Sequence, residues 1–138
     1  VLAALLFDDP RFLDASIDMP ARWVDTARSL ADVETPEQFI DSSALGIFYD
    51  PYPLGSVVAS WYWSLFQGLS DPGEGLRLLE SGALALGGEL ARADGWGEDL
   101  RWLMLEGTLE AADGSVRDRG CALAEERLIG VELRPCMP

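Results

Sequence analysis

The sequence contains no histidine, no lysine and no asparagine, and all ten of its basic residues are arginines. Histidine is the side chain whose ordinary pKa lies nearest neutral pH, so its absence excludes Ser-His-Asp and Cys-His catalysis and His-ligated metal sites. The missing lysine excludes a Schiff base and a P-loop. An enzyme would have to work with carboxylates, Tyr, Ser, Cys or Arg, or with a borrowed cofactor. We therefore favour a non-enzymatic protein without cofactor or metal ion.

The absence of Lys and Asn, whose codons are AT-rich, indicates a GC-rich bacterial genome. A salt-rich cytoplasm would also favour an acidic, lysine-poor chain. The 138 residues carry 24 acidic side chains and a formal net charge of −14. This charge disfavours binding to nucleic acid and to anionic membrane surfaces. It permits a basic protein partner, although solubility alone also explains it.

Only two cysteines are present, Cys121 and Cys136, and no CxxC motif accompanies them. We expect two reduced thiols in a cytoplasmic protein. The apolar stretch VLAALLF has no basic residue beside it and is too short to span a bilayer, so it is not read as a signal peptide.

Charged residues are also absent from residues 51–70, PYPLGSVVASWYWSLFQGLS. On a helical wheel, Ser56, Ser60, Ser64 and Gln67 form one narrow stripe, and nearly all other positions are apolar. A helix that is apolar around most of its circumference is buried. With roughly 15 helical residues and no basic flanks it falls short of the ~20 needed to cross a membrane. We predict a central core helix over 54–69.

The motif DPGE at 71–74 predicts a helix over 72–94, and TPEQ, DDPRF and Pro20 suggest helix starts in the first 50 residues. Spacing places Leu76, Leu79, Ala83, Leu86 and Leu90 on the inner face of the 72–94 helix. The small residues of 81–88 predict close contact with another helix, for which the serine stripe is the candidate.

Two interpretations remain for residues 103–134. The first is a helix whose inner face includes Leu100, Leu103, Met104 and Ala111, then a turn, a second helix and a short strand. The second is a small antiparallel sheet, because Asp113-Gly114 is typical of a type I′ hairpin turn and residues 129–134 alternate in polarity. We favour the first interpretation.

These patterns predict a mainly α fold: one compact domain, 1–138, of five to six helices around the helix at 54–69. The alternative is an α+β fold with a small C-terminal antiparallel sheet.

Acidic residues are densest in residues 1–50, where ten acidic residues face three arginines, a net charge of −7. We predict that this part docks on a basic protein, as an immunity, inhibitor or accessory protein would; a merely solvated surface is the alternative. The predicted partner-binding residues are Asp8, Asp9, Asp14, Asp18, Tyr49, Asp50 and Tyr52.

A second functional hypothesis is a small apolar-ligand binder, or a carboxylate-based enzyme, with a cavity beside the 54–69 helix. Its ligand-binding residues would be Ser60, Trp61, Trp63, Ser64 and Gln67. Glu106 and Glu110, four apart on a helix, would offer two carboxylates to a hard cation or a shared proton. A third hypothesis is a homo-oligomer with the tryptophans at its interface.

Overall fold

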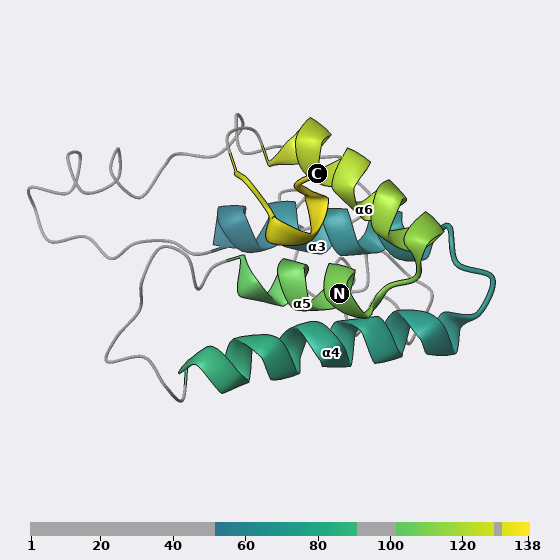
Figure 1. The fold of residues 1–138 in the computed structure, drawn as a ribbon, viewed down its shortest axis with the longest axis horizontal. Coiled ribbons are helices and arrows are strands. Elements are labelled where there is room, and N and C mark those ends of the chain that lie inside the picture. The colour runs from purple at the N-terminus through teal and green to yellow at the C-terminus, as the bar shows by residue number, and fades with distance from the viewer. Residues whose placement is uncertain (1–51, 91–101, 129–130) are drawn as a thin grey trace, which may run out of the picture. The chain divides into compact units, whose positions relative to one another are not determined.

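A computed structural model of the protein describes residues 52–90, 102–128 and 131–138 (Figure 1). In chain order, its elements are α3 (Tyr52–Phe66), α4 (Pro72–Leu90), α5 (Leu103–Ala111), α6 (Gly114–Arg127) and the short 3₁₀ helix η4 (Arg134–Cys136). The described part contains no strand, which confirms the mainly α prediction. The helix starts predicted at TPEQ, DDPRF and Pro20 lie outside the described residues.

The chain divides into two compact units, Val1–Ser64 with Glu126–Ile129, and Leu65–Glu125 with Gly130–Pro138. The first unit therefore holds most of α3 and the last two residues of α6. The second holds α4, α5, the rest of α6 and the C-terminal segment. The organisation as a single domain stays a prediction.

The neutral stretch folds as helix α3, with Trp61 and Tyr62 completely buried and Phe66 nearly so. This confirms the helical prediction over most of 54–69. The helix begins earlier than predicted because Pro53 lies in its first turn, where a backbone N–H has no intrahelical acceptor. It ends at Phe66, where the amides of Gly68 and Leu69 bond the carbonyls three residues before them. These tighter bonds replace the α-helical pattern.

Helix α4 begins where the sequence predicts. Oδ1 of Asp71 accepts a hydrogen bond from the backbone N–H of Gly73 at 2.8 Å, and the Asp71 carbonyl accepts from Glu74 N–H at 3.0 Å. Asp71 is thus the N-cap, and Pro72 opens the helix with its φ already fixed.

Helices α4 and α5 lie side by side in the second unit (Figure 1). Their contact is made by small residues. A Cβ placed on Gly107 of α5 would overlap the Cβ of Ala85 and would lie 3.3 Å from Cα of Gly82. The hydroxyl of Thr108 donates to the carbonyl of Leu78 at 3.1 Å. Close approach at 81–88 is therefore confirmed, with α5 as the observed neighbour.

The predicted inner faces of both helices are wrong in detail. Leu76 and Ala83 of α4 are exposed, whereas Gly75, Leu78 and Gly82 are buried. In α5 the buried residues are Leu105, Glu106, Gly107, Thr108 and Leu109, and Ala111 is exposed. Counting apolar residues misplaces these faces because glycines, rather than leucines, occupy the points of closest approach.

A short turn joins α5 to α6. Asp113, in the turn, caps the start of α6, and Arg117 of α6 binds carbonyls at the end of α5. Oδ1 of Asp113 accepts from Val116 N–H and from the Ser115 hydroxyl, both at 2.9 Å. Arg117 donates to the carbonyls of Leu109 and Ala112, at 3.0 and 3.1 Å. An anion at a helix N-terminus and a cation at a C-terminus are both favourable. Asp113-Gly114 is therefore the start of a second helix, as the favoured interpretation expected, and does not form the type I′ hairpin turn of the alternative.

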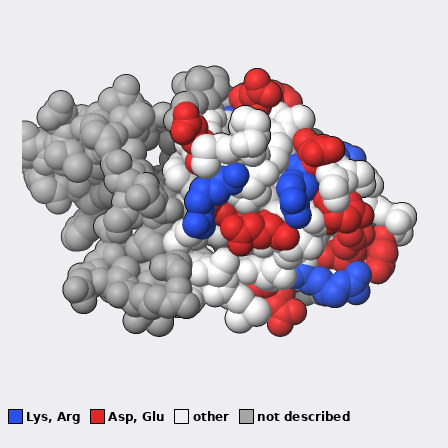
Figure 2. Space-filling view, viewed as in Figure 1, with Lys and Arg blue, Asp and Glu red and all other residues white. Residues whose placement is uncertain are grey.

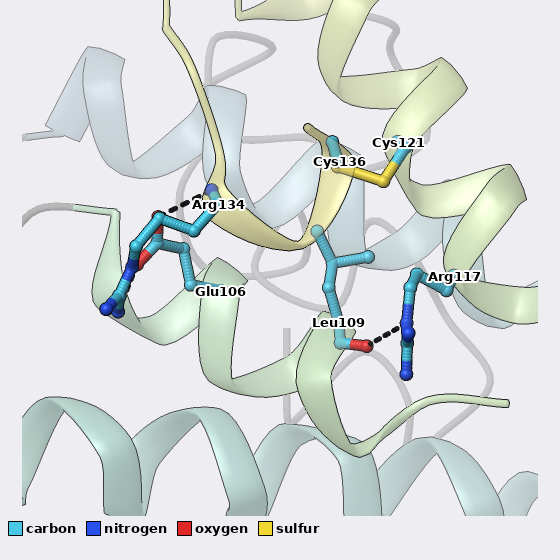
Figure 3. Close-up of a disulfide and its surroundings, with 6 residues drawn as sticks. All are labelled: Glu106, Leu109, Arg117, Cys121, Arg134 and Cys136. Atoms are coloured by element: carbon cyan, nitrogen blue, oxygen red, sulfur yellow. Dashed lines mark hydrogen bonds and ion pairs between the residues drawn. A yellow bond between two sulfur atoms is a disulfide. The ribbon is translucent and has the colours of Figure 1, made fainter. Parts of the chain in front are cut away.

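The C-terminal segment, residues 131–138, returns to α5 and α6. Residues 131–133 have no regular structure and η4 follows, so the short strand predicted there is not observed in the described residues. Cys136 of η4 forms a disulfide with Cys121 of α6, with the two Cα atoms 5.4 Å apart (Figure 3). The prediction of two reduced thiols is wrong, because the return of the chain brings the sulfurs together.

Candidate functional site

The distribution of charge is the feature of the described residues that bears most on function. These residues hold eleven acidic side chains and five arginines. Three arginines, described next, bind backbone carbonyls or the buried Glu106 rather than surface carboxylates.

Arg127, in the last turn of α6, is 6% exposed. Its Nη1 donates to the Ser60 carbonyl of α3 at 2.7 Å and lies 3.4 Å from the Ser60 hydroxyl oxygen. The guanidinium of Arg127 is thus directed at the backbone of α3. A buried cation needs such polar contacts because desolvation is costly.

Arg134 binds Glu106 of α5 through both its backbone and its side chain (Figure 3). Its backbone N–H donates to Oε1 of Glu106 at 2.9 Å, and Nε and Nη2 lie 2.9 and 2.7 Å from Oε2. The Glu106 side chain is 9% exposed and that of Arg134 62%. Since Arg134 occupies both oxygens, the Glu106 carboxylate is not open to share a cation or proton with Glu110.

Arg117, the third of these arginines, is half-buried and binds the carbonyls at the end of α5. Most carboxylates of the described residues thus form no ion pair with an arginine. Among the described residues, ion pairs are formed by Asp71 with Arg77 and by Glu106 with Arg134. The exposed acidic residues outside these pairs are Glu80, Glu110, Asp113, Asp118, Glu125, Glu126 and Glu132. Figure 2 shows acidic side chains at several places on one face, with arginines interspersed among them.

Asp113 is the exposed acid whose protonation the fold influences. The backbone N–H of Val116 and the hydroxyl of Ser115 both donate to its carboxylate and lower its pKa from 3.8. Hydrogen bonds to the charged form stabilise that form. Asp113 therefore stays ionised at the start of α6 across the neutral and mildly acidic range.

The predicted partner-binding residues Asp8, Asp9, Asp14, Asp18, Tyr49 and Asp50 lie outside the described residues, and Tyr52 is the first residue of α3. Their role stays a prediction. The acids on α6 were not among the predicted site residues. The acidic residues of α6 were visible in the sequence, but residues 1–50 have a higher density of negative charge and were therefore preferred as the binding region.

The predicted ligand-binding residues lie along α3 and just beyond it. Ser60 and Trp61 are buried, Trp63 is nearly so, Ser64 is half-buried, and Gln67 is exposed past the helix end. The Ser60 hydroxyl donates to the Val57 carbonyl at 3.0 Å. The ring of Trp61 meets that of Tyr62 edge to face, with centroids 4.9 Å apart. Ser60 and Trp61 thus contribute to packing; a ligand-binding role for the five stays a prediction.

Sequence reasoning missed the role of Arg127. Nothing around it in GCALAEERLIG distinguishes it from the exposed Arg119 on the same helix. The distinction comes from the contact with Ser60, which lies 67 positions away in the chain.

No family model, no curated protein and no solved structure matches the chain. None of the helices among the described residues has the length and apolar character needed to cross a membrane.

Proposed function

We propose that this chain is a non-enzymatic binding domain that docks on a basic protein, in the manner of an immunity, inhibitor or accessory protein. The observation that supports the proposal is the unequal use of charge. Arginines 117, 127 and 134 bind internal carbonyls or the buried Glu106, while most acids are exposed and unpaired within the described residues. Among the described residues, exposed acids therefore outnumber exposed arginines.

An exposed carboxylate without a neighbouring cation produces an electrostatic potential that extends about a Debye length, ~8 Å at physiological ionic strength. Several together steer a basic partner and raise its association rate. The predicted docking residues are the aspartates at 8, 9, 14 and 18, with Tyr49, Asp50 and Tyr52 beside them. The exposed acids of α5 and α6 would add long-range attraction without direct contact.

The test is affinity capture with the tagged full-length chain from a GC-rich bacterial lysate at low and high salt, followed by titration of each purified captured protein. The proposal expects a basic partner whose association rate falls steeply with salt. Replacing Asp8, Asp9, Asp14 and Asp18 by Asn should slow association and speed dissociation, because rim charges act on association and direct contacts on dissociation.

The matched control removes four charges elsewhere: Glu110, Glu125 and Glu126 replaced by Gln, and Asp118 by Asn. This variant should slow association but leave dissociation unchanged. If the two variants changed the dissociation rate equally, the four aspartates would not form a specific docking site. The acidic residues would then act only by long-range electrostatic attraction of the partner. Binding that neither salt nor the four-aspartate variant weakens would contradict the proposal.

The location we propose is the cytoplasm, as the sequence suggested. Disulfides that occur in the cytosol of mesophilic organisms are usually transient and serve catalysis or redox sensing. In that location, we expect the Cys121–Cys136 disulfide to respond to the redox conditions of the cell. The oligomeric state stays a prediction that sedimentation at two protein concentrations would test.

A further inference from the structure

The C-terminal segment is fastened to the helices at two points of different chemistry. Toward α6 it is held by the Cys121–Cys136 disulfide, and toward α5 by the contacts of Arg134 with Glu106. Between them Leu133 is 2% exposed. In Figure 3 the side chain of Leu109 points toward η4, which lies over it. The segment thus covers part of the apolar surface of α5.

The two fastenings differ in how they can be undone. Both cysteine residues are half-buried, so neither lies in the core. The ion pair is partly solvated, since the Arg134 side chain is mostly exposed. Exposed charges contribute little against the entropy of a freed chain end. The disulfide is therefore the stronger fastening, and the remaining contacts alone hold the segment weakly.

We infer that the Cys121–Cys136 disulfide is a redox latch: a dithiol reductant releases the C-terminal segment and uncovers the Leu109 and Leu133 surface, while α4 and α5 stay folded. This inference uses the proposed cytoplasmic location, where such reductants are found. It does not depend on the proposed basic partner, because residues 131–138 are not among those predicted to bind that partner.

The reaction is ordinary thiol–disulfide exchange. A thiolate of the reductant attacks one sulfur of the pair, the S–S bond breaks, and the other cysteine leaves as a thiolate that takes up a proton. The second thiol of the reductant then displaces the first cysteine. Two electrons pass to the protein, which gains two thiols, and the reductant becomes a disulfide.

The separation of 15 residues between the cysteines sets the expected size of the effect. Removing a cross-link that closes a loop of this length raises the population of opened chain by roughly a hundredfold. The packing of α4 on α5 includes neither cysteine, so it should not change.

The test is proteolysis of the full chain by a glutamate-specific protease, with and without dithiothreitol. Cleavage after Glu132 reports release of the segment; cleavage after Glu110 and Glu125, exposed residues of α5 and α6, reports loss of the helices. Reduction should speed cleavage after Glu132 at least tenfold and leave the other two sites unchanged. The double variant Cys121→Ser, Cys136→Ser should behave in the same way without reductant.

Two results would overturn the latch. Unchanged cleavage after Glu132 in the double variant would show that the other contacts hold the segment by themselves. Equal acceleration at all three sites would show a structural cross-link on which the whole fold depends. Titration in glutathione buffers completes the test: the latch requires half-reduction within the range of cytosolic redox potentials, and a bond that stays oxidised throughout would be permanent. A basic partner could still bind in either case.

Discussion

The α4–α5 pair and the C-terminal segment lie in the same unit and are held in opposite ways. Helices α4 and α5 are held together by close packing of their backbones. Gly82 and Gly107 allow this approach, and the Thr108 hydroxyl donates a hydrogen bond to the Leu78 carbonyl. Within the described part of the chain, the C-terminal segment is held by a disulfide and by the contacts of Arg134 with Glu106, and Leu133 is its most buried residue. Packing of the first kind is insensitive to salt and reductant, whereas the second depends on both.

The largest effect is expected from Gly107→Ala. Its new Cβ would overlap that of Ala85, so the helices must separate, at a cost of about 1–3 kcal/mol in the free energy of unfolding. Gly87→Ala is the matched control because a Cβ there meets nothing within 4 Å. It should stabilise α4 by up to about 1 kcal/mol. Urea unfolding followed by circular dichroism measures both, and equal effects would show that α4 and α5 do not meet as closely as described.

The next prediction tests the hydrogen bond between α4 and α5. Thr108→Val keeps the shape of the side chain but removes the hydroxyl that donates to Leu78 and Met104. We expect a loss of about 1 kcal/mol. Thr108→Ser keeps the hydroxyl and should recover the hydrogen-bond part of that loss. If Val and Ser behave alike in urea unfolding, the bond between the helices contributes nothing.

A smaller and salt-dependent effect is expected for the contact between Arg134 of the C-terminal segment and Glu106. Arg134→Ala leaves the buried Glu106 with less compensation and should cost about 0.5–1 kcal/mol at low salt, and less at high salt. Arg77→Ala, the control, breaks a pair 3.4 Å long in which both side chains are mostly exposed, so it should cost close to nothing. Unfolding at two salt concentrations separates the two variants. A salt-independent loss for Arg134→Ala would contradict a charge-based fastening.

The smallest effect concerns Asp113, whose contacts lie at the α5–α6 corner. Because folding lowers its pKa below 3.8, its carboxylate adds stability above that pH and loses the contribution as the pH falls through the folded value. Asp113→Asn should therefore be slightly less stable than the parent chain at neutral pH. The difference should vanish in acid, and a pH-independent difference would mean that the charge is irrelevant to the cap.

The sequence predicted those features that depend on local chemistry. The uncharged stretch with its tryptophans gave helix α3 and its burial, and Asp71-Pro72 gave the start of α4. It failed where contacts between distant residues decide. Leucine spacing put Leu76 on the inner face, but the observed face follows the glycines that another helix approaches.

The same limit applies to the charges and the cysteines. Arg127 and Arg119 look equivalent in sequence, and only the distant Ser60 distinguishes them. The Cys121–Cys136 bond depends on the return of the C-terminal segment, for which the spacing of two cysteines is no guide. The predicted docking aspartates lie outside the described residues, so the acidic site still depends on sequence reasoning.

The difference between the packed α4–α5 pair and the disulfide-linked C-terminal segment is tested most directly by residue-resolved hydrogen exchange. The full chain is measured oxidised and reduced, at low and high salt. The reporter amides are those of Cys136 and Met137, which bond the carbonyls of Leu133 and Arg134, against the amides within α4 and α5. We predict that reduction accelerates exchange at the two reporters, more so at high salt, and leaves α4 and α5 unchanged in all four conditions. Reporters and helices that accelerate together would contradict the account.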